Sequence, residues 1–197
     1  MIRAVLALSL CLFLPACGSF LAAIDSGPIE DDPGERTTGA RVEDESIETK
    51  GKVNISAADE RFDDAHFSVT SYNGYVLIVG QVPDQALKDR ASDVVREIRG
   101  VRRIYNELEI SGNTSGLVRS SDTWLTTKVK SALLSADDIQ GNRVKVVTEN
   151  GVVYLMGLVS TTEADRIVEV ARSTGGVQKV VQIFELIDRD FEPDASS

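Results

Sequence analysis

The sequence predicts an α+β protein made of two tandem α-β-β-α-β modules, each a three-stranded mixed sheet packed against two helices. Three observations predict this fold: an internal repeat, an Asn-Gly turn between two apolar segments in each copy, and helical periodicity after each turn. The chain has 197 residues, 42% of them hydrophobic, which is enough for two small cores. We place the modules at residues 47–112 and 119–188.

The internal repeat consists of two landmarks that recur at nearly one spacing. The sequence Asn-Gly-Tyr-Val-Leu-Ile-Val-Gly at residues 73–80 returns as Asn-Gly-Val-Val-Tyr-Leu-Met-Gly at residues 150–157. The Gly-Val pair at residues 100–101 is matched by a second Gly-Val pair at residues 176–177. Two landmarks duplicated in the same order indicate two copies of one structural unit.

The second copy can be followed element by element. An Asn-Gly pair favours a two-residue hairpin turn, because both turn positions need positive φ. Ser160 and Glu163 have the spacing of a capping box, which opens an amphipathic helix ended by a Gly-Gly pair. The predicted strands are residues 143–149, 152–159 and 177–187.

The first copy repeats this order, and each copy also has a leading helix. In the second copy the leading helix is predicted at residues 123–135, capped by Ser121 or Asp122. In the first, residues 47–61 contain Gly51 and Asn54 and form a poor helix by propensity. The other elements expected in the first copy are strands at 67–72, 75–82 and 101–110 and a helix at 84–99.

The N-terminal residues predict an export signal with a lipid attachment site. Arg3 precedes an apolar run that is too short to span a bilayer comfortably, and Leu-Pro-Ala-Cys at residues 14–17 resembles a lipobox. We therefore expect a lipoprotein signal peptide at residues 1–16 and a mature chain that starts at an acylated Cys17. The alternative is an ordinary secretory signal with an incidental cysteine. Gly18 follows the lipidated residue, which under the sorting rule of enteric bacteria implies the outer membrane.

The segments outside the modules are predicted to lack a fold. Residues 17–46 are rich in acids, Gly, Pro and Thr, so they bury too little apolar surface to offset chain entropy and are expected to form a lipidated, flexible, acidic tether. Residues 189–197 are expected to be a disordered tail. The only other cysteine, Cys11, lies in the predicted signal, so the mature chain would contain no disulfide.

Two segments of the second copy carry a family resemblance. Ser-Asp-Thr-Trp-Leu-Thr-Thr-Lys-Val-Lys at residues 121–130 and Thr-Glu-Asn-Gly-Val-Val-Tyr-Leu-Met-Gly-Leu-Val at residues 148–159 resemble the BON domain. Two such units behind a lipobox resemble the dual-BON outer-membrane lipoproteins. The resemblance implies a non-enzymatic protein, lipid-anchored on the periplasmic side of the outer membrane, that binds anionic phospholipid through the leading helix of its second domain. It also implies support of envelope integrity, enrichment at division sites and links to the outer-membrane protein assembly machinery.

A helical wheel of the second leading helix separates a core face from an outer face. Leu125, Val129 and Leu133 share one arc, whereas Trp124, the only tryptophan, points away from it. An exposed Trp beside a Lys suits a membrane interface. The alternatives are that Trp124 folds over the helix N-terminus or packs between the modules, and that Leu134 belongs to the core. The predicted lipid-binding residues are Trp124, Thr127, Lys128, Ser131, Leu134 and Ser135.

The charge of the chain argues against one other class of function and leaves the surface near the leading helix open. The net charge of −10 disfavours nucleic-acid binding, which needs clustered bases. Near the leading helix, the bases Lys128, Lys130, Arg119, Arg143 and Lys145 would form either a local positive surface or scattered solvated charge.

Catalysis has little support in the sequence. His66 is the only histidine and precedes a predicted strand, and no His, Cys and acid cluster has metal-ligand spacing. We therefore expect no catalytic residue, metal, cofactor or small-molecule substrate. The competing hypothesis to lipid binding is a protein-interaction adaptor or chaperone for an envelope assembly complex, which docks its partner through the same apolar face.

Overall fold

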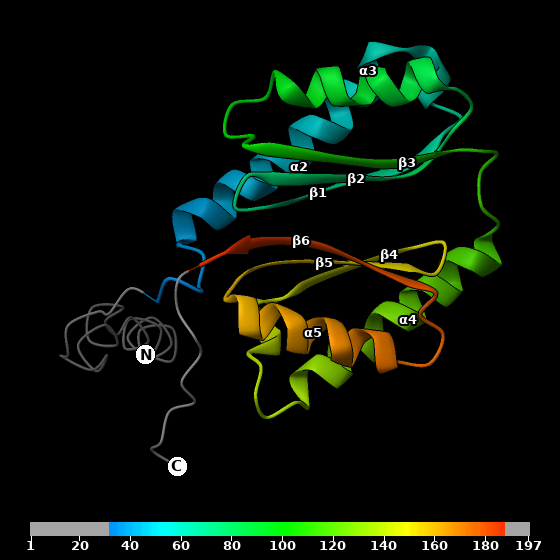
Figure 1. Ribbon diagram of the computed structural model, residues 1–197. Helices are drawn as coiled ribbons and strands as arrows, with labels where there is room; N and C mark the ends of the chain where they lie inside the picture. Colours follow the sequence, from blue (N-terminus) through cyan, green and yellow to red (C-terminus); the bar gives the residue numbers. More distant parts are fainter. Residues whose placement is uncertain (1–31, 188–197) are drawn as a thin grey trace, which may run out of the picture. The chain divides into compact units, whose positions relative to one another are not determined.

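The computed structural model describes residues 32–187, which contain both modules (Figure 1). The predicted signal peptide, Cys17, most of the tether and the C-terminal tail lie outside these residues. The first module contains α2 (Thr38–Ala58), a 3-10 turn η3 (Glu60–Phe62), β1 (His66–Tyr72), β2 (Tyr75–Val82), α3 (Gln85–Arg96) and β3 (Arg103–Ile110). The second contains α4 (Gly116–Leu134), η4 (Gly141–Arg143), β4 (Lys145–Glu149), β5 (Val152–Val159), α5 (Thr161–Ser173) and β6 (Lys179–Leu186).

Each module has a mixed three-stranded sheet with the second strand of its hairpin in the centre, which confirms the predicted fold class. The strand orders are β1-β2-β3 and β4-β5-β6; the first pair in each sheet is antiparallel and the second is parallel. Asn73 and Asn150 both have φ of 50°, and the glycines after them also have positive φ. In each module the Asn and the Gly after it form the tight two-residue hairpin turn that the sequence predicts.

Both leading helices begin earlier than the sequence predicts. The helix α2 starts at Thr38 rather than at residue 47, so the end of the expected flexible tether is helical and that expectation is wrong for residues 38–46. Its Gly51 lies against Val69, where an added Cβ would come within 2.9 Å of the valine side chain. Close packing on the sheet therefore overrides the poor intrinsic propensity of this segment.

The helix α4 starts at Gly116, with Ser115 as its N-cap, and not at Thr123. The predicted caps Ser121 and Asp122 both lie inside the helix. Smaller boundary differences occur at the strands: Arg143 belongs to η4, so the first strand of the second module starts at Lys145. The capping box of α5 is confirmed, since the Ser160 hydroxyl accepts a hydrogen bond from the backbone N–H of Glu163.

A buried aspartate on each leading helix holds the hairpin turn of its own module. Asp44 accepts hydrogen bonds from the backbone N–H groups of Asn73 and Gly74 at 2.8 and 2.9 Å. Asp122 accepts from the N–H groups of Asn150 and Gly151, both at 2.9 Å. Turn donors that face the protein interior need such partners, so each carboxylate fixes its helix relative to the sheet.

The two sheets pack face to face, and the helices cover their outer faces (Figure 1). On β2, Val76 and Ile78 point toward the helices, whereas Leu77 and Val79 point toward the other sheet. The central strand β5 alternates in the same way. Both central strands therefore read as nearly continuous apolar runs, which is typical of strands buried on both faces. The shared core contains Tyr72, Leu77, Val79, Tyr154, Met156, Leu158 and Ile183.

Polar contacts between the sheets follow the internal repeat. Asn73 donates to Glu185 at 2.7 Å, and its counterpart Asn150 donates to Glu109 at 3.3 Å. Arg102 also pairs with Glu185 through two hydrogen bonds of 2.6 and 2.7 Å. Equivalent residues of the two modules thus meet reciprocally, as they do across the two-fold interface of a symmetric dimer.

Asp44 should make the stability of the first module sensitive to acid. Burial would raise its pKa, but hydrogen bonds from Ser71, Gly74, Asn73 and Arg36 outweigh that effect and hold the pKa of Asp44 below its ordinary value. A lowered pKa in the folded state stabilises the fold above the unfolded value of about 4, and this stabilisation is lost as the pH falls through the folded value.

We expect Asp44→Asn to reduce the dependence of the unfolding free energy on pH below about pH 5. Urea unfolding measured by circular dichroism at several pH values checks this. Asp93→Asn removes an exposed carboxylate of the same module and controls for the change in net charge. Equal pH dependence in Asp44→Asn and the unaltered chain would contradict the assignment.

Candidate functional site

The helix α4 has one face in the core of the second module and one face open to solvent. Leu125, Val129 and Leu133 are buried in that core, and Asp122 lies on the same side. Their spacing of three or four residues places them on one stripe, because an α-helix has 3.6 residues per turn. The residues on the opposite stripe therefore face outward, whereas Thr126, Lys128 and Ala132 lie at the edges of the buried face and are partly exposed.

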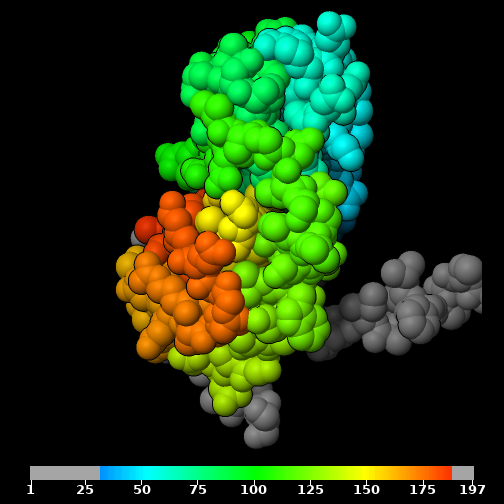
Figure 2. All heavy atoms as spheres, turned by 90° about the vertical axis from the view of Figure 1, so that its right-hand side faces the viewer, coloured from blue at the N-terminus to red at the C-terminus, as the bar shows by residue number. Residues whose placement is uncertain are grey.

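The outward face of α4 carries three large apolar side chains. Leu117 is 84% exposed, Trp124 65% and Leu134 64%. Figure 2 shows α4 in light green along the surface of the second module, beside α5 in orange. Leu117 and Trp124 are two turns apart, about 10 Å along the helix axis. We call this surface the α4 outer face; it consists of Leu117, Trp124, Thr127, Ser131, Leu134 and Ser135.

The structure places five of the six predicted lipid-binding residues on the α4 outer face. Trp124 neither folds over the helix end nor packs between the modules, so both alternatives to its exposure are wrong. Leu134 is not a core residue either. Lipid binding by these side chains stays a prediction, because exposure alone does not identify what they bind.

Lys128 has a different environment from the other five. It is partly buried, and its Nζ donates a hydrogen bond to the backbone carbonyl of Gly175, just beyond the end of α5. A cation at the C-terminal end of a helix is stabilised by the carbonyls that lack helical partners. Lys128 therefore links α4 to α5 and is a less accessible cation than the sequence predicts.

The hydroxyl groups near Trp124 are satisfied by their own helix. Thr127 donates to the carbonyl of Thr123 at 3.0 Å, and Ser135 donates to the carbonyl of Ser131 at 2.9 Å. Their need for water is reduced, because these hydroxyls already have a partner. The α4 outer face can thus lose much of its hydration at a smaller cost than free hydroxyls would impose.

The sequence of α4 contains three bases and one acid, although the whole chain is strongly acidic. The acid is Asp122, which is buried and occupied by the hairpin turn. The outer face therefore presents no carboxylate. An anionic surface can approach it without meeting a like charge from this helix.

Sequence reasoning missed Leu117, the most exposed large apolar side chain of the helix. It lies before the predicted helix start, so no wheel position was assigned to it. The available signal was its seven-residue spacing from Trp124, which becomes meaningful once Ser115 is recognised as the N-cap.

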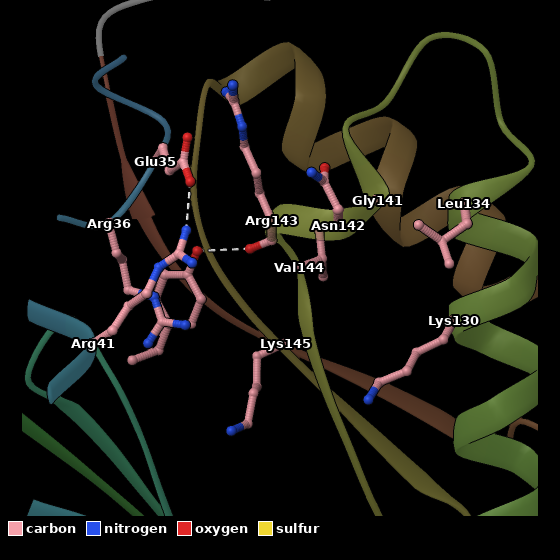
Figure 3. Close-up of a pocket in the computed structure, with 11 residues that line it drawn as sticks. Glu35, Arg36, Arg41, Lys130, Leu134, Gly141, Asn142, Arg143, Val144 and Lys145 are labelled. Atoms are coloured by element: carbon pink, nitrogen blue, oxygen red, sulfur yellow. Dashed lines mark hydrogen bonds and ion pairs between the residues drawn. The ribbon is translucent and has the colours of Figure 1, made fainter. Parts of the chain in front are cut away.

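Three of the five bases predicted near this helix gather in one cleft, whereas two lie elsewhere. Lys130, Arg143 and Lys145 line a cleft of about 410 Å³ together with Arg36 and Arg41 of the first module (Figure 3). Arg119 instead donates to the carbonyl of Thr114 at 3.1 Å. Three of the predicted bases therefore gather at one place, together with two arginines and the carboxylate of Glu35 from outside the second module.

The described residues offer little for catalysis or metal binding. Within residues 32–187, no group of three or more His, Cys, Asp or Glu side chains is arranged to hold a metal ion. His66 lies 4.0 Å from a carboxylate oxygen of Glu149. Over the same residues, no helix has the length and hydropathy needed to cross a membrane.

A family comparison agrees with this architecture. The BON domain model matches residues 43–112 and 121–186, which cover both modules. The chain therefore belongs to the BON domain family and contains two copies of the domain.

Individual relatives can also be named. The chain is 35% identical over 182 residues to the outer membrane lipoprotein DolP of Haemophilus influenzae, a match that covers 90% of this chain and 92% of the relative. It is 37% identical over 153 residues to the 21 kDa hemolysin of Actinobacillus pleuropneumoniae, covering 77% and 78%. It is 28% identical to the osmotically-inducible protein Y of Escherichia coli, covering 84% and 86%.

Proposed function

We propose that this protein is a non-enzymatic outer-membrane lipoprotein that binds anionic phospholipid through the α4 outer face. The observation that carries the proposal is a helix face with Trp124 at its centre, open to solvent and free of carboxylates. The similarity to a relative named outer membrane lipoprotein DolP supports the membrane assignment. In this proposal the lipid on Cys17 holds the folded part on the periplasmic side, where it supports envelope integrity, including at division sites.

The geometry of α4 fits a helix that lies on a bilayer. Its 19 residues span about 28 Å, and the exposed apolar side chains are distributed from the first turn to the last. Trp places its ring at the depth of the lipid headgroups, and leucines at both ends reach the acyl boundary. Such a helix binds in the plane of the interface rather than across it.

Vesicle binding tests the proposal directly. The protein without residues 1–17 keeps all of residues 32–187 and removes the contribution of the lipid anchor. We expect it to float with phosphatidylcholine vesicles that contain about a third phosphatidylglycerol, and Trp124→Glu to weaken this binding at least about tenfold, equivalent to 1.4 kcal/mol. The reason is that a carboxylate replaces the interfacial ring and repels the anionic lipid.

The matched control is Val53→Glu, which adds the same charge at an exposed apolar residue of α2. Its binding should stay close to that of the unaltered protein. Equal binding by Trp124→Glu and the unaltered protein would reject the α4 outer face as the lipid site. Crosslinking from position 124 in cells addresses the adaptor hypothesis: a single protein adduct that does not depend on lipid would favour it over the proposal.

A further inference from the structure

A basic cleft joins the end of the α4 outer face to the first module. It contains Lys130 and Leu134 of α4, Arg143 of η4, Lys145 of β4 and Arg41 of α2. Figure 3 shows Lys130 extending from α4 toward the side of the cleft formed by α2. Leu134 belongs both to this cleft and to the α4 outer face, so the two surfaces are continuous.

The cations of the cleft differ in how firmly they are held. Arg36, also in the lining, is committed to the fold: it pairs with the buried Asp44 at 2.7 Å and stacks over the ring of Tyr72 at 3.8 Å. Lys145 lies at 3.5 Å from Glu48, at the outer limit of a hydrogen bond. Lys130 has no ion pair within residues 32–187.

The two other arginines are paired with acids from one short segment. Arg143 pairs with Asp32, and Arg41 pairs with Glu35. Both acids belong to the turn just before α2, in which the N–H of Glu35 donates to the carbonyl of Asp32 at 2.9 Å. The Arg41 and Glu35 side chains are more than half exposed, and exposed ion pairs of this kind contribute little to stability.

We infer that this cleft binds the phosphate of an anionic phospholipid and that Asp32 and Glu35 occupy its arginines in the absence of lipid. The inference rests on the proposed function and extends it from the helix face to the headgroup. Figure 3 shows the side chains of Lys130 and Arg143 extending away from each other, so anionic headgroups would meet the ammonium of Lys130 at the end of the cleft beside α4 and the forked guanidinium of Arg143 at the other end, where Asp32 holds it. The acyl chains of the same lipid would then lie against Leu134 and the rest of the α4 outer face.

The acids give the site an intramolecular competitor. Each carboxylate supplies an anion that the arginine would otherwise take from a ligand, so lipid must displace it. The segment that carries them lies on the side of the chain that leads to Cys17. The acidic residues before α2 therefore lower the affinity of the cleft and raise its selectivity for surfaces dense in negative charge.

Two double variants test the site in the protein without residues 1–17. With the phosphatidylglycerol vesicles used above, Lys130→Gln/Arg143→Gln should bind at least about tenfold more weakly. Asp32→Asn/Glu35→Gln should bind about threefold more tightly, since the competing carboxylates are removed. Binding to pure phosphatidylcholine vesicles should not change in either variant.

Matched controls on α3 separate the cleft from general electrostatics. Arg90→Gln/Arg96→Gln and Asp93→Asn/Glu97→Gln produce the same charge changes at exposed residues of α3 and its C-cap in the first module. The cleft is rejected if each cleft variant behaves like its control, and the proposed function survives that result when Trp124→Glu still weakens binding. If the cleft variants act but Trp124→Glu does not, the cleft is supported and the α4 outer face is rejected.

Inorganic phosphate distinguishes a lipid headgroup from a free anion. Titration up to about 20 mM, followed by NMR shifts of the backbone amides beside the cleft, should produce only weak and unsaturated changes if the site requires the membrane-bound ester. Saturable binding of inorganic phosphate that is abolished in Lys130→Gln/Arg143→Gln, without any loss of vesicle binding, would overturn the lipid assignment.

Discussion

Leu77→Ala is expected to lower the free energy of unfolding by about 3 kcal/mol. Leu77 is fully buried on β2, but it faces the other sheet rather than the helices of its own module. Truncation removes apolar contacts and leaves a cavity between the two sheets. Urea unfolding of the protein without residues 1–17, followed by circular dichroism, measures the loss.

The control for this variant is Leu186→Ala, which makes the same chemical change at a side chain that is 62% exposed. Its unfolding free energy should change by less than about 0.5 kcal/mol. If Leu77→Ala were equally mild, the inner faces of the sheets would not be in contact, and the reciprocal contacts of Asn73 and Asn150 would not form.

Asp122→Ala is the second substitution with a large expected effect, a loss of about 3 kcal/mol. It removes the acceptor for the N–H groups of Asn150 and Gly151, which then lie beside the helix without a hydrogen-bond partner. Asp122→Asn keeps one side-chain oxygen and should lose roughly half as much. Thermal or urea unfolding measures both variants.

Asp138→Ala provides the comparison for this aspartate. Asp138 is exposed and forms only a surface pair with Arg166 at 3.3 Å, so its removal should cost less than about 0.5 kcal/mol. A loss for Asp122→Ala that is no larger than this would mean that solvent, and not the carboxylate, satisfies the turn. The loss of unfolding free energy in Asp44→Ala would show whether the equivalent carboxylate stabilises the turn of the first module to the same extent.

Lipid affinity and fold stability should respond to different substitutions. Trp124 and Leu134 point outward and contribute little to the core, so their removal should affect vesicle binding and leave the unfolding free energy nearly unchanged. Leu77 and Asp122 are buried, so their removal should lower the unfolding free energy without a direct effect on vesicle binding. This separation allows a loss of binding to be assigned to the surface rather than to unfolding.

The sequence predicted most elements because they depend on local signals. The Asn-Gly turns require positive φ, and the capping box at Ser160 begins α5. The helical periodicity of Leu125, Val129 and Leu133 determines which way Trp124 points. The starts of the two leading helices were predicted too late in the chain. Gly51 made α2 look like a poor helix although it packs closely on Val69, and Asp122 looked like an N-cap although it binds the hairpin turn from inside α4. Local propensity cannot predict that a glycine packs against a valine of the sheet, or that an aspartate accepts hydrogen bonds from a turn far along the chain.

By itself, the sequence determined the two-module α+β fold, the order of its elements and the outward position of Trp124, because each of these follows from periodicity or turn chemistry within a few residues. Only the tertiary structure decided that the sheets meet face to face, that Lys128 is tied to α5 and that Arg41, Lys130 and Arg143 share one cleft. These contacts join residues far apart in the chain. Their free energy depends on which surfaces meet in space, and no local pattern encodes that choice.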